Sequence, residues 1–151
     1  MSAGPRDGVP AERRTPLSVL LIAAERALAA ELEEGLRTAG YADLRAAHAQ
    51  VFAALDPEGA RLTDLAARAG MTKQAMGELV RYLEQHGYLE VEPDSRDRRA
   101  KVIRPTERGL SAHGASAWLL AESDRRLSER LGDQGLLDLR ARLGVISGAG
   151  R

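Results

Sequence analysis

The sequence has 151 residues, 22 Lys and Arg against 22 Asp and Glu, 44% apolar residues and no cysteine. This length predicts one domain or one compact protomer of two lobes with a sizeable core. The lack of cysteine excludes disulfides, thiolate metal sites and cysteine nucleophiles. No apolar run approaches the roughly 18 residues of a membrane-spanning helix. The first residues also lack a signal-peptide pattern, so a cytoplasmic location is expected.

The first third of the chain predicts a tail and two helices. Residues 1–15 combine Gly, Pro and charge without apolar periodicity, which is typical of a disordered tail. Residues 16–38 predict a long helix whose apolar stripe consists of Leu17, Leu21, Ala24, Leu28, Leu32 and Leu36. This stripe is wider than one neighbouring helix requires, so we expect the helix to pack on its own lobe and to join a dimer. Residues 42–55 predict a second helix with Leu44, Ala47, Val51 and Leu55 facing inward.

Residues 62–87 have the pattern of two helices joined by a tight turn at Gly70. Thr63 and Thr72 are the candidate N-caps of these helices. The second helix turns a polar face outward, made of Lys73, Gln74, Gly77, Glu78 and Arg81. A short helix, a turn and a second helix that is polar near its start form a helix-turn-helix, which places a recognition helix in the major groove.

Two strand-like runs follow, at residues 88–92 and 100–104, joined by a charged turn. Four cations lie close together there, at Arg96, Arg98, Arg99 and Lys101. A charged turn alone is often just solvated, but arginine on a thin loop beside a helix-turn-helix can enter the minor groove of DNA. Because carboxylates repel phosphate, Asp94 and Asp97 are interpreted as partners of Arg96 and Arg99 that stiffen the loop.

The last third predicts two more helices. The first spans residues 106–131, is capped by Thr106, and has as inner residues Leu110, Ala117, Ala121, Leu127 and Leu131. Trp118 is interpreted as packed at a helix interface, with a pocket for an aromatic effector as the alternative. Asp133 is expected to cap the final helix, and residues 147–151 to be loose.

This order of elements resembles the MarR family of bacterial winged helix-turn-helix transcriptional regulators. The resemblance is carried by residues 65–89, LAARAGMTKQAMGELVRYLEQHGYL, and by residues 94–99, DSRDRR, which fit the family's wing pattern D-x-R-D-x-R. Residues 106–109, TERG, match the usual ending of the motif, although Pro105 stands where an apolar residue is more common.

The resemblance implies a mainly α (α+β) fold, with a winged helix-turn-helix DNA-binding lobe and a dimerisation lobe built from N- and C-terminal helices. The expected divisions are a disordered tail at 1–15, an N-terminal dimerisation helix at 16–41, the winged-helix lobe at 42–105, C-terminal dimerisation helices at 106–147 and a loose tail at 148–151. The implied function is that of a homodimeric transcriptional regulator, more often a repressor, that reads a pseudo-palindrome in double-stranded DNA.

Within each winged-helix lobe, Lys73, Gln74 and Gly77 are expected at the major groove. Gln pairs with adenine, Lys donates to guanine, and Gly permits close approach. Thr72 and Arg81 are expected at phosphates.

In the wing, Arg98 is expected in the minor groove. Arg96 and Arg99 are expected at phosphates as well as beside the two aspartates, and Lys101 belongs to the same DNA-binding set.

The resemblance also implies a small phenolic or lipophilic effector between the two lobes, although the sequence leaves open that none exists. Its candidate lining is Tyr41, His48, Phe52 and Trp118. A packed, hydrogen-bonded His48 is the alternative to a ligand-binding or pH-sensing one. No metal-ligand spacing and no enzyme template is found, so neither a metal, a cofactor nor catalysis is expected. The competing function is a winged-helix protein-interaction module that does not bind DNA, which the neutral net charge favours.

Overall fold

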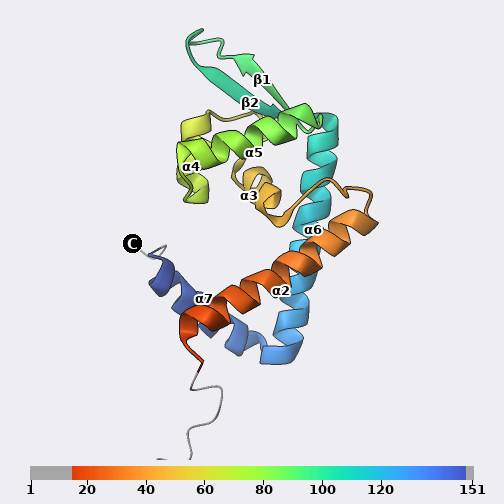
Figure 1. Cartoon of the computed structure of the whole chain (residues 1–151), viewed down its shortest axis with the longest axis vertical. Coiled ribbons are helices and arrows are strands. Elements are labelled where there is room, and N and C mark those ends of the chain that lie inside the picture. Colours follow the sequence, from red (N-terminus) through yellow and green to blue (C-terminus); the bar gives the residue numbers. More distant parts are fainter. Residues whose placement is uncertain (1–14, 149–151) are drawn as a thin grey trace, which may run out of the picture.

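The computed structural model describes residues 15–148 (Figure 1). The elements in chain order are α2 (Leu17–Thr38), α3 (Ala46–Ala54), α4 (Leu62–Ala69), α5 (Lys73–Gln85), β1 (Leu89–Pro93), β2 (Lys101–Pro105), α6 (Glu107–Leu131) and α7 (Asp133–Ser147). The predicted fold class is confirmed, since the chain is mainly helical with one two-stranded antiparallel sheet. The expected tails fall almost wholly on residues 1–14 and 149–151, which lie outside the described part.

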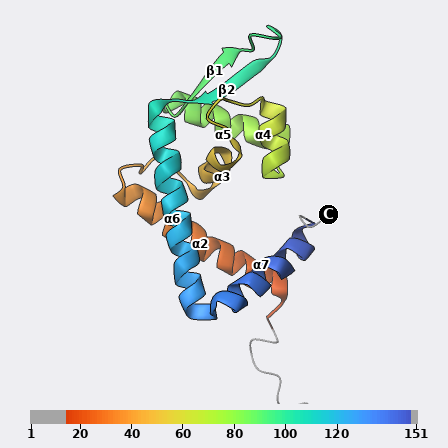
Figure 2. The same ribbon diagram turned by 180° about the vertical axis from the view of Figure 1, so that it is seen from behind.

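The helices form two lobes that are joined by α6. Figures 1 and 2 show α3, α4, α5 and the hairpin at one end of the molecule, and α2, α7 and the second half of α6 at the other. Helix α6 starts directly after the hairpin and crosses α2 on its way to α7. The hairpin and α5 are therefore held at the end of the molecule farthest from α7.

The second helix is shorter than predicted. It begins at Ala46 instead of residue 42, because residues 41–45 form a turn. The backbone N–H of Arg45 donates to Nδ1 of His48 over 2.9 Å, which caps the new start. Leu44 is buried as expected, although it precedes the helix.

Hydroxyl caps fix the starts of the recognition helix and of α6. The Oγ1 atoms of Thr72 and Thr106 accept the backbone N–H three residues later, as predicted. Two other predicted caps are wrong. Helix α4 starts two residues earlier than the predicted Thr63 cap implies, with Arg61 at its N-cap, so Thr63 lies inside the helix. Asp133 is the first residue of α7 and not its cap.

The winged-helix lobe has a contiguous core. Its largest fully buried side chains include Phe52, Leu65, Met76, Leu83, Tyr88 and Leu89. In the hairpin, Val91 lies opposite Ile103. Ile103 also exchanges two backbone hydrogen bonds with Ala60, at 2.9 and 3.0 Å. These bonds tie the hairpin to the segment before α4, so the wing has a fixed base.

The other lobe buries few of its own side chains. Within the described residues, α2 buries only Leu32 and Leu36, and α7 buries none. The inner face predicted for the long C-terminal helix is wrong, because α6 buries Gly109, Ala112 and Ser116. Of the predicted inner residues, four are exposed, namely Leu110, Ala117, Ala121 and Leu131. Trp118, predicted to pack at a helix interface, is also exposed.

Gly109 lies where the first turn of α6 passes the backbone of Tyr88. A Cβ atom at Gly109 would lie 2.0 Å from the carbonyl oxygen of Tyr88, so only glycine fits. The hydroxyl of Thr106 holds this turn, because it donates to the carbonyl of Gly87 at 2.7 Å and accepts the N–H of Gly109 at 3.0 Å. The end of the recognition helix and the start of α6 are thus in direct backbone contact.

Gly109→Ala should destabilise the protein by about 1–3 kcal/mol, because the added methyl group cannot be accommodated against backbone. Gly77→Ala is the matched control in another helix, since its added Cβ would meet only Leu62 Cδ2, at 3.7 Å. That control should be neutral or stabilise by roughly 0.5–1 kcal/mol. Urea unfolding of both variants measures the difference, and equal midpoints would contradict the proposed contact.

Candidate nucleic-acid interface

The recognition helix α5 has one exposed polar face. Its inward face is buried at Met76, Val80 and Leu83. The residues predicted to contact DNA lie at its start or along the opposite face, where Thr72, Lys73, Gln74 and Arg81 are exposed and Gly77 is half-buried. All of these residues except Thr72 line a shallow surface hollow, together with Leu62 and Glu78. The structure therefore brings these predicted residues together on one surface.

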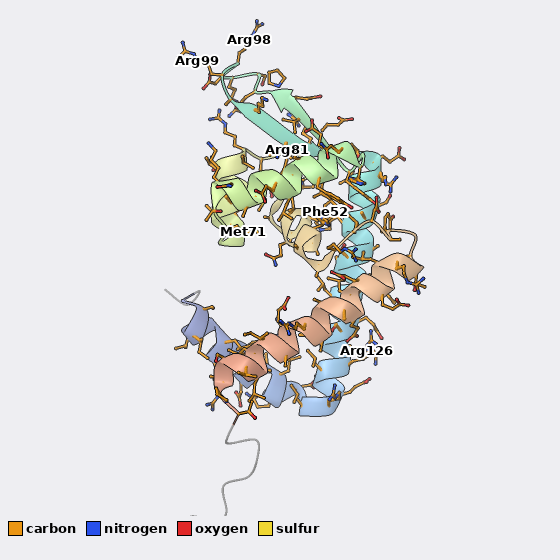
Figure 3. The ribbon with its side chains drawn as sticks, in the orientation of Figure 1. Phe52, Met71, Arg81, Arg98, Arg99 and Arg126 are labelled. Carbon is orange, nitrogen blue, oxygen red and sulfur yellow. The ribbon has the colours of Figure 1, made fainter. Side chains whose placement is uncertain are left out.

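The wing carries its cations outward. Arg96, Arg98, Arg99 and Lys101 are all exposed. Figure 3 shows Arg98 and Arg99 at the outer tip of the hairpin, pointing away from the body of the lobe. Within residues 15–148, no ion pair joins any of these four side chains to a carboxylate. The four charges are thus available to an external partner.

Asp94 is paired with an arginine that sequence analysis did not select. The predicted partner was the side chain of Arg96, but Arg96 contributes only its backbone N–H, which donates to Asp94 Oδ1 over 2.9 Å. The guanidinium that pairs with Asp94 is that of Arg61, whose Nη2 and Nε lie 2.5 and 3.1 Å from Oδ2. The Arg96 N–H and the Arg61 charge together hold the pKa of Asp94 below its usual range.

Asp97 also bonds to backbone instead of to a guanidinium. Its Oδ1 accepts the backbone N–H of Arg99 over 3.1 Å. The carbonyl of Asp97 accepts the N–H of Ala100, at 2.9 Å, and the N–H of Asp94 donates to the carbonyl of Ala100, also at 2.9 Å. Both aspartates therefore stabilise the wing turn through backbone hydrogen bonds, and neither pairs with the guanidinium group of Arg96 or Arg99.

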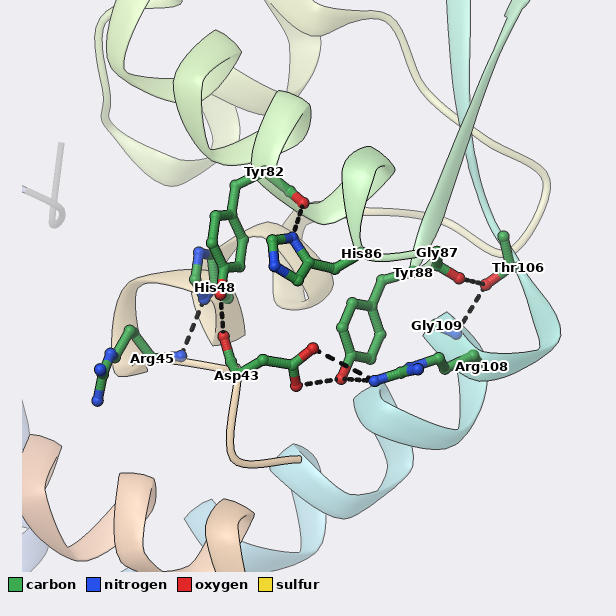
Figure 4. A network of polar contacts seen from close by, with 10 residues as sticks. All are labelled: Asp43, Arg45, His48, Tyr82, His86, Gly87, Tyr88, Thr106, Arg108 and Gly109. Atoms are coloured by element: carbon green, nitrogen blue, oxygen red, sulfur yellow. Dashed lines mark hydrogen bonds and ion pairs between the residues drawn. The ribbon is translucent and has the colours of Figure 1, made fainter. Parts of the chain in front are cut away.

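A cluster of polar contacts, the Asp43 cluster, joins α5 and α6 to the turn after α2 (Figure 4). The hydroxyl of Tyr88 donates to Asp43 Oδ1 over 2.6 Å, and Arg108 Nη2 donates to that hydroxyl over 2.8 Å. The hydroxyl of Tyr82 donates to the carbonyl of Asp43, at 2.6 Å. Burial and the bond to Asp43 raise the pKa of Tyr88. The cluster is not evident from the sequence, because its bonded residues are 20 to 65 positions apart.

Three rings stack beside this cluster. His48 lies 4.6 Å from Tyr82 between ring centroids, and Tyr82 lies 3.9 Å from His86. Nδ1 of His48 is already an acceptor for the N–H of Arg45, and burial lowers the pKa of His48. Of the two predicted alternatives for His48, the structure has the packed, hydrogen-bonded side chain.

The four residues predicted to line an effector pocket do not form one pocket. His48 and Phe52 are buried in the core, and Tyr41 packs against it. Trp118 lies on the outside of the other lobe. A groove of about 480 Å³ lies instead between α2, α3, α6 and α7, with a lining that includes Leu21, Ala24, Leu28, Ala49, Leu120 and Leu143. We refer to it as the interlobe groove. The predicted lining was mostly aromatic, whereas this one is mostly aliphatic, with Glu25 and Gln50 as its polar members.

Across residues 15–148, no helix is both long and apolar enough to cross a bilayer. The same residues contain no group of three or more His, Cys, Asp or Glu side chains that could hold a metal ion.

Comparison with known proteins identifies the class of this fold. A model of the MarR family matches residues 42–100, and no curated protein sequence matches significantly. The chain is similar to the transcriptional repressor CouR bound to a 23-mer DNA duplex (22% identity, 87% of this chain and 92% of that chain, TM-score 0.75). It is also similar to MepR of S. aureus in complex with DNA (19% identity, 89% and 98%, TM-score 0.77). A third similar structure is CouR from Rhodococcus jostii RHA1 bound to p-coumaroyl-CoA (24% identity, 88% and 92%, TM-score 0.71).

The fold and the polar surface at its end define a winged helix-turn-helix protein. The family match spans α3, α4, α5, β1 and the wing turn, and it ends at residue 100, directly before β2. The MarR family model thus matches the winged-helix part of the chain, in agreement with the sequence resemblance.

Asp94→Asn should loosen the wing in a pH-dependent way. A carboxyl whose pKa is lowered by folding stabilises the folded state above the pKa of the unfolded chain, and this contribution is lost as the pH falls through the folded pKa. At neutral pH the variant should therefore show less protection of the Arg96 amide against hydrogen exchange. The difference from the unsubstituted protein should vanish well below pH 4, about the pKa of an unperturbed aspartate.

Asp97→Asn is the matched control, because Asp97 has no guanidinium partner within the described residues. Equal Arg96 protection in the Asp94 variant and the unsubstituted protein at pH 7 would contradict a structural role for the Arg61–Asp94 pair.

Proposed function

We propose that this chain is a homodimeric, sequence-specific DNA-binding regulator that represses transcription from a pseudo-palindromic operator. One observation carries the proposal. The polar face of α5 and the free cations of the wing lie at the same end of the molecule, as two different reading elements (Figures 1 and 3). A recognition helix suits the major groove, and arginines on a thin hairpin suit the adjacent minor groove.

The recognition helix supplies the contacts to base edges. Gln74 is suited to a bidentate pair with adenine, and Lys73 to donation toward guanine. Gly77 lies between them and Arg81 along the exposed face, where the lack of a side chain permits close approach to the groove floor. Thr72, at the start of the helix, and Arg81 contact phosphates in this arrangement, which positions the helix without reading sequence.

The wing supplies the second contact. Arg98 enters the minor groove, because it projects from the tip and has no carboxylate partner among the described residues. Arg96, Arg99 and Lys101 flank it and contact phosphates. Arg104, in contrast, is held by the carbonyl of Glu58 at 2.5 Å, so it stays at the base of the wing.

A second copy of the chain is proposed to cover the apolar surface of α2, α6 and α7. This surface exposes many large side chains, including Leu17, Ile22, Leu120, Leu137, Val145 and Ile146. An exposed apolar surface on this scale is unfavourable for a monomer in water and is typical of an interface. A two-fold axis through this lobe would hold two recognition helices, which a pseudo-palindrome requires about 34–36 Å apart.

The interlobe groove is the proposed effector site. Its volume of about 480 Å³ is within the usual range for small-molecule pockets. Its aliphatic lining favours a lipophilic body, and the similar CouR structure holds p-coumaroyl-CoA. A ligand that fits only one relative arrangement of the lobes would shift the population of DNA-competent dimers and release the operator.

Selection of binding sites from random duplex DNA by the purified protein should enrich an inverted repeat. On that duplex, Arg98→Ala should weaken binding by about 1–3 kcal/mol. Arg37→Ala, which removes the same charge from an exposed position in α2, should have little effect. Affinity should fall steeply with salt, because each phosphate contact releases counterions.

The alternative, a protein-interaction module, predicts the opposite results. Absence of any enriched sequence, or binding that is insensitive to salt, would favour it over the proposed regulator. Equal losses of DNA affinity in Arg98→Ala and Arg37→Ala would contradict the placement of Arg98 in the minor groove. They would not contradict DNA binding itself.

Ile22→Glu should convert the dimer into monomers, because it places a charge in the apolar surface of α2. Ile22 is 52% exposed in the single chain, so the substitution should not disturb the protomer itself. Gln134→Glu adds the same charge at an exposed, polar position of α7 and should leave the protein dimeric. Light scattering over a range of concentrations measures both. A monomeric unsubstituted protein, or a dimeric Ile22 variant, would count against this interface.

A further inference from the structure

A second hollow, of about 500 Å³, lies where the last turns of α2 cross the middle of α6. We call it the Trp118 hollow. It shares no lining residue with the interlobe groove. Its volume lies in the range of small-molecule sites. Neither DNA binding nor the proposed dimer uses it.

Trp118 is the most unusual residue of this hollow. It is the only tryptophan of the chain, and 65% of it is exposed. It shares a helix face with Glu122, Arg125 and Glu129, four, seven and eleven residues further on, which is the polar face of α6. The proposed dimer surface of α6 is a different face, so it does not explain an exposed indole among charged residues.

The rings of the described chain make several aromatic and cation contacts, but none of those found between residues 15 and 148 involves Trp118. The largely exposed indole thus has no aromatic or cationic partner among these residues.

The floor of the hollow is small and apolar. Gly35 of α2 lies against Leu119 of α6, where a Cβ on the glycine would come 2.4 Å from Leu119 Cδ2. This close helix crossing leaves an apolar floor beside the indole. A ligand here needs an apolar body.

The lining of the hollow carries one more carboxylate than cation. Its lining includes Glu31 and Glu34 against a single cation, Arg126, which lies 2.7 Å from Glu31. Glu34 is exposed and pairs with Arg37 along α2 at 2.5 Å. Glu31 and Glu34 also lie in the last turns of α2, where the free carbonyl groups carry a partial negative charge.

We propose that the Trp118 hollow binds a small organic cation with an apolar body. The cation lies over the indole and beside Glu34, and the body lies on the Gly35–Leu119 floor. Tryptophan is the side chain best suited to hold an organic cation, because its ring face is electron-rich. An anion is disfavoured over the electron-rich ring face, and a neutral ligand lacks the electrostatic attraction that a cation has to it.

The single tryptophan allows a direct test on the unlabelled full-length protein. Benzyltrimethylammonium should change the emission of Trp118 with saturation. Benzyl alcohol and benzenesulfonate, the neutral and anionic probes, should not. Glu34→Gln should weaken binding of the cation roughly two- to fivefold, as expected for an exposed charge pair. Glu129→Gln removes a carboxylate from the same face of α6 outside the hollow and should leave the affinity unchanged.

Calorimetry with Trp118→Leu supplies the complementary measurement, with a loss of roughly three- to tenfold expected. The proposal is overturned if the three probes give the same response, or if Glu34→Gln and Glu129→Gln bind the cation equally. Failure of acrylamide to quench Trp118 in the free protein would also overturn it, because the indole would then be covered by a second copy. None of these results depends on DNA binding, so they leave the regulator proposal untouched.

Discussion

The partly buried hydrogen bond between Tyr88 and Asp43 sets the relation between the two lobes. Tyr88 directly follows the recognition helix, and its hydroxyl donates to Asp43 in the turn after α2. Arg108, in the first turn of α6, donates to the same hydroxyl and lies over the tyrosine ring at 4.4 Å. A buried hydroxyl is costly unless it is satisfied, so the three segments are held in one arrangement. The orientation of α5 relative to α2 and α6 depends on this contact.

The same contact region explains how a ligand bound far from the DNA-reading surface would change the position of that surface. The interlobe groove is lined by Ala46 and Ala49 of α3. Helix α3 starts at the cap between Arg45 and His48, and His48 stacks on Tyr82 of the recognition helix. Packed interfaces between helices have a few discrete arrangements rather than a continuous range. A ligand in the groove would therefore select among a few orientations of α5, which is what a change of operator affinity requires.

Local features were predictable from the sequence, and long-range ones were not. Thr72 and Thr106 predict helix starts, because a threonine hydroxyl can accept the backbone N–H three residues later. Both of these hydrogen bonds are present. The partner of Asp94 is Arg61, 33 residues away, and no spacing rule connects them. The inner face of α6 was misassigned for a different reason. An apolar stripe shows that a surface avoids water, but it does not show whether the protomer or a second copy covers it, and Leu110 and Leu131 are left exposed by the protomer.

The neutral net charge of the chain is compatible with a DNA-binding wing because of how its carboxylates are used. If Asp94 and Asp97 were paired with Arg96 and Arg99, two of the four wing cations would be turned toward carboxylates and away from phosphate. Instead, Arg61 from outside the wing neutralises Asp94, and Asp97 bonds to backbone. The carboxylates thus shape the turn while the guanidinium groups remain outward. What attracts a phosphate is the local field at the tip rather than the sum over the chain, since solvent and salt screen the more distant acids.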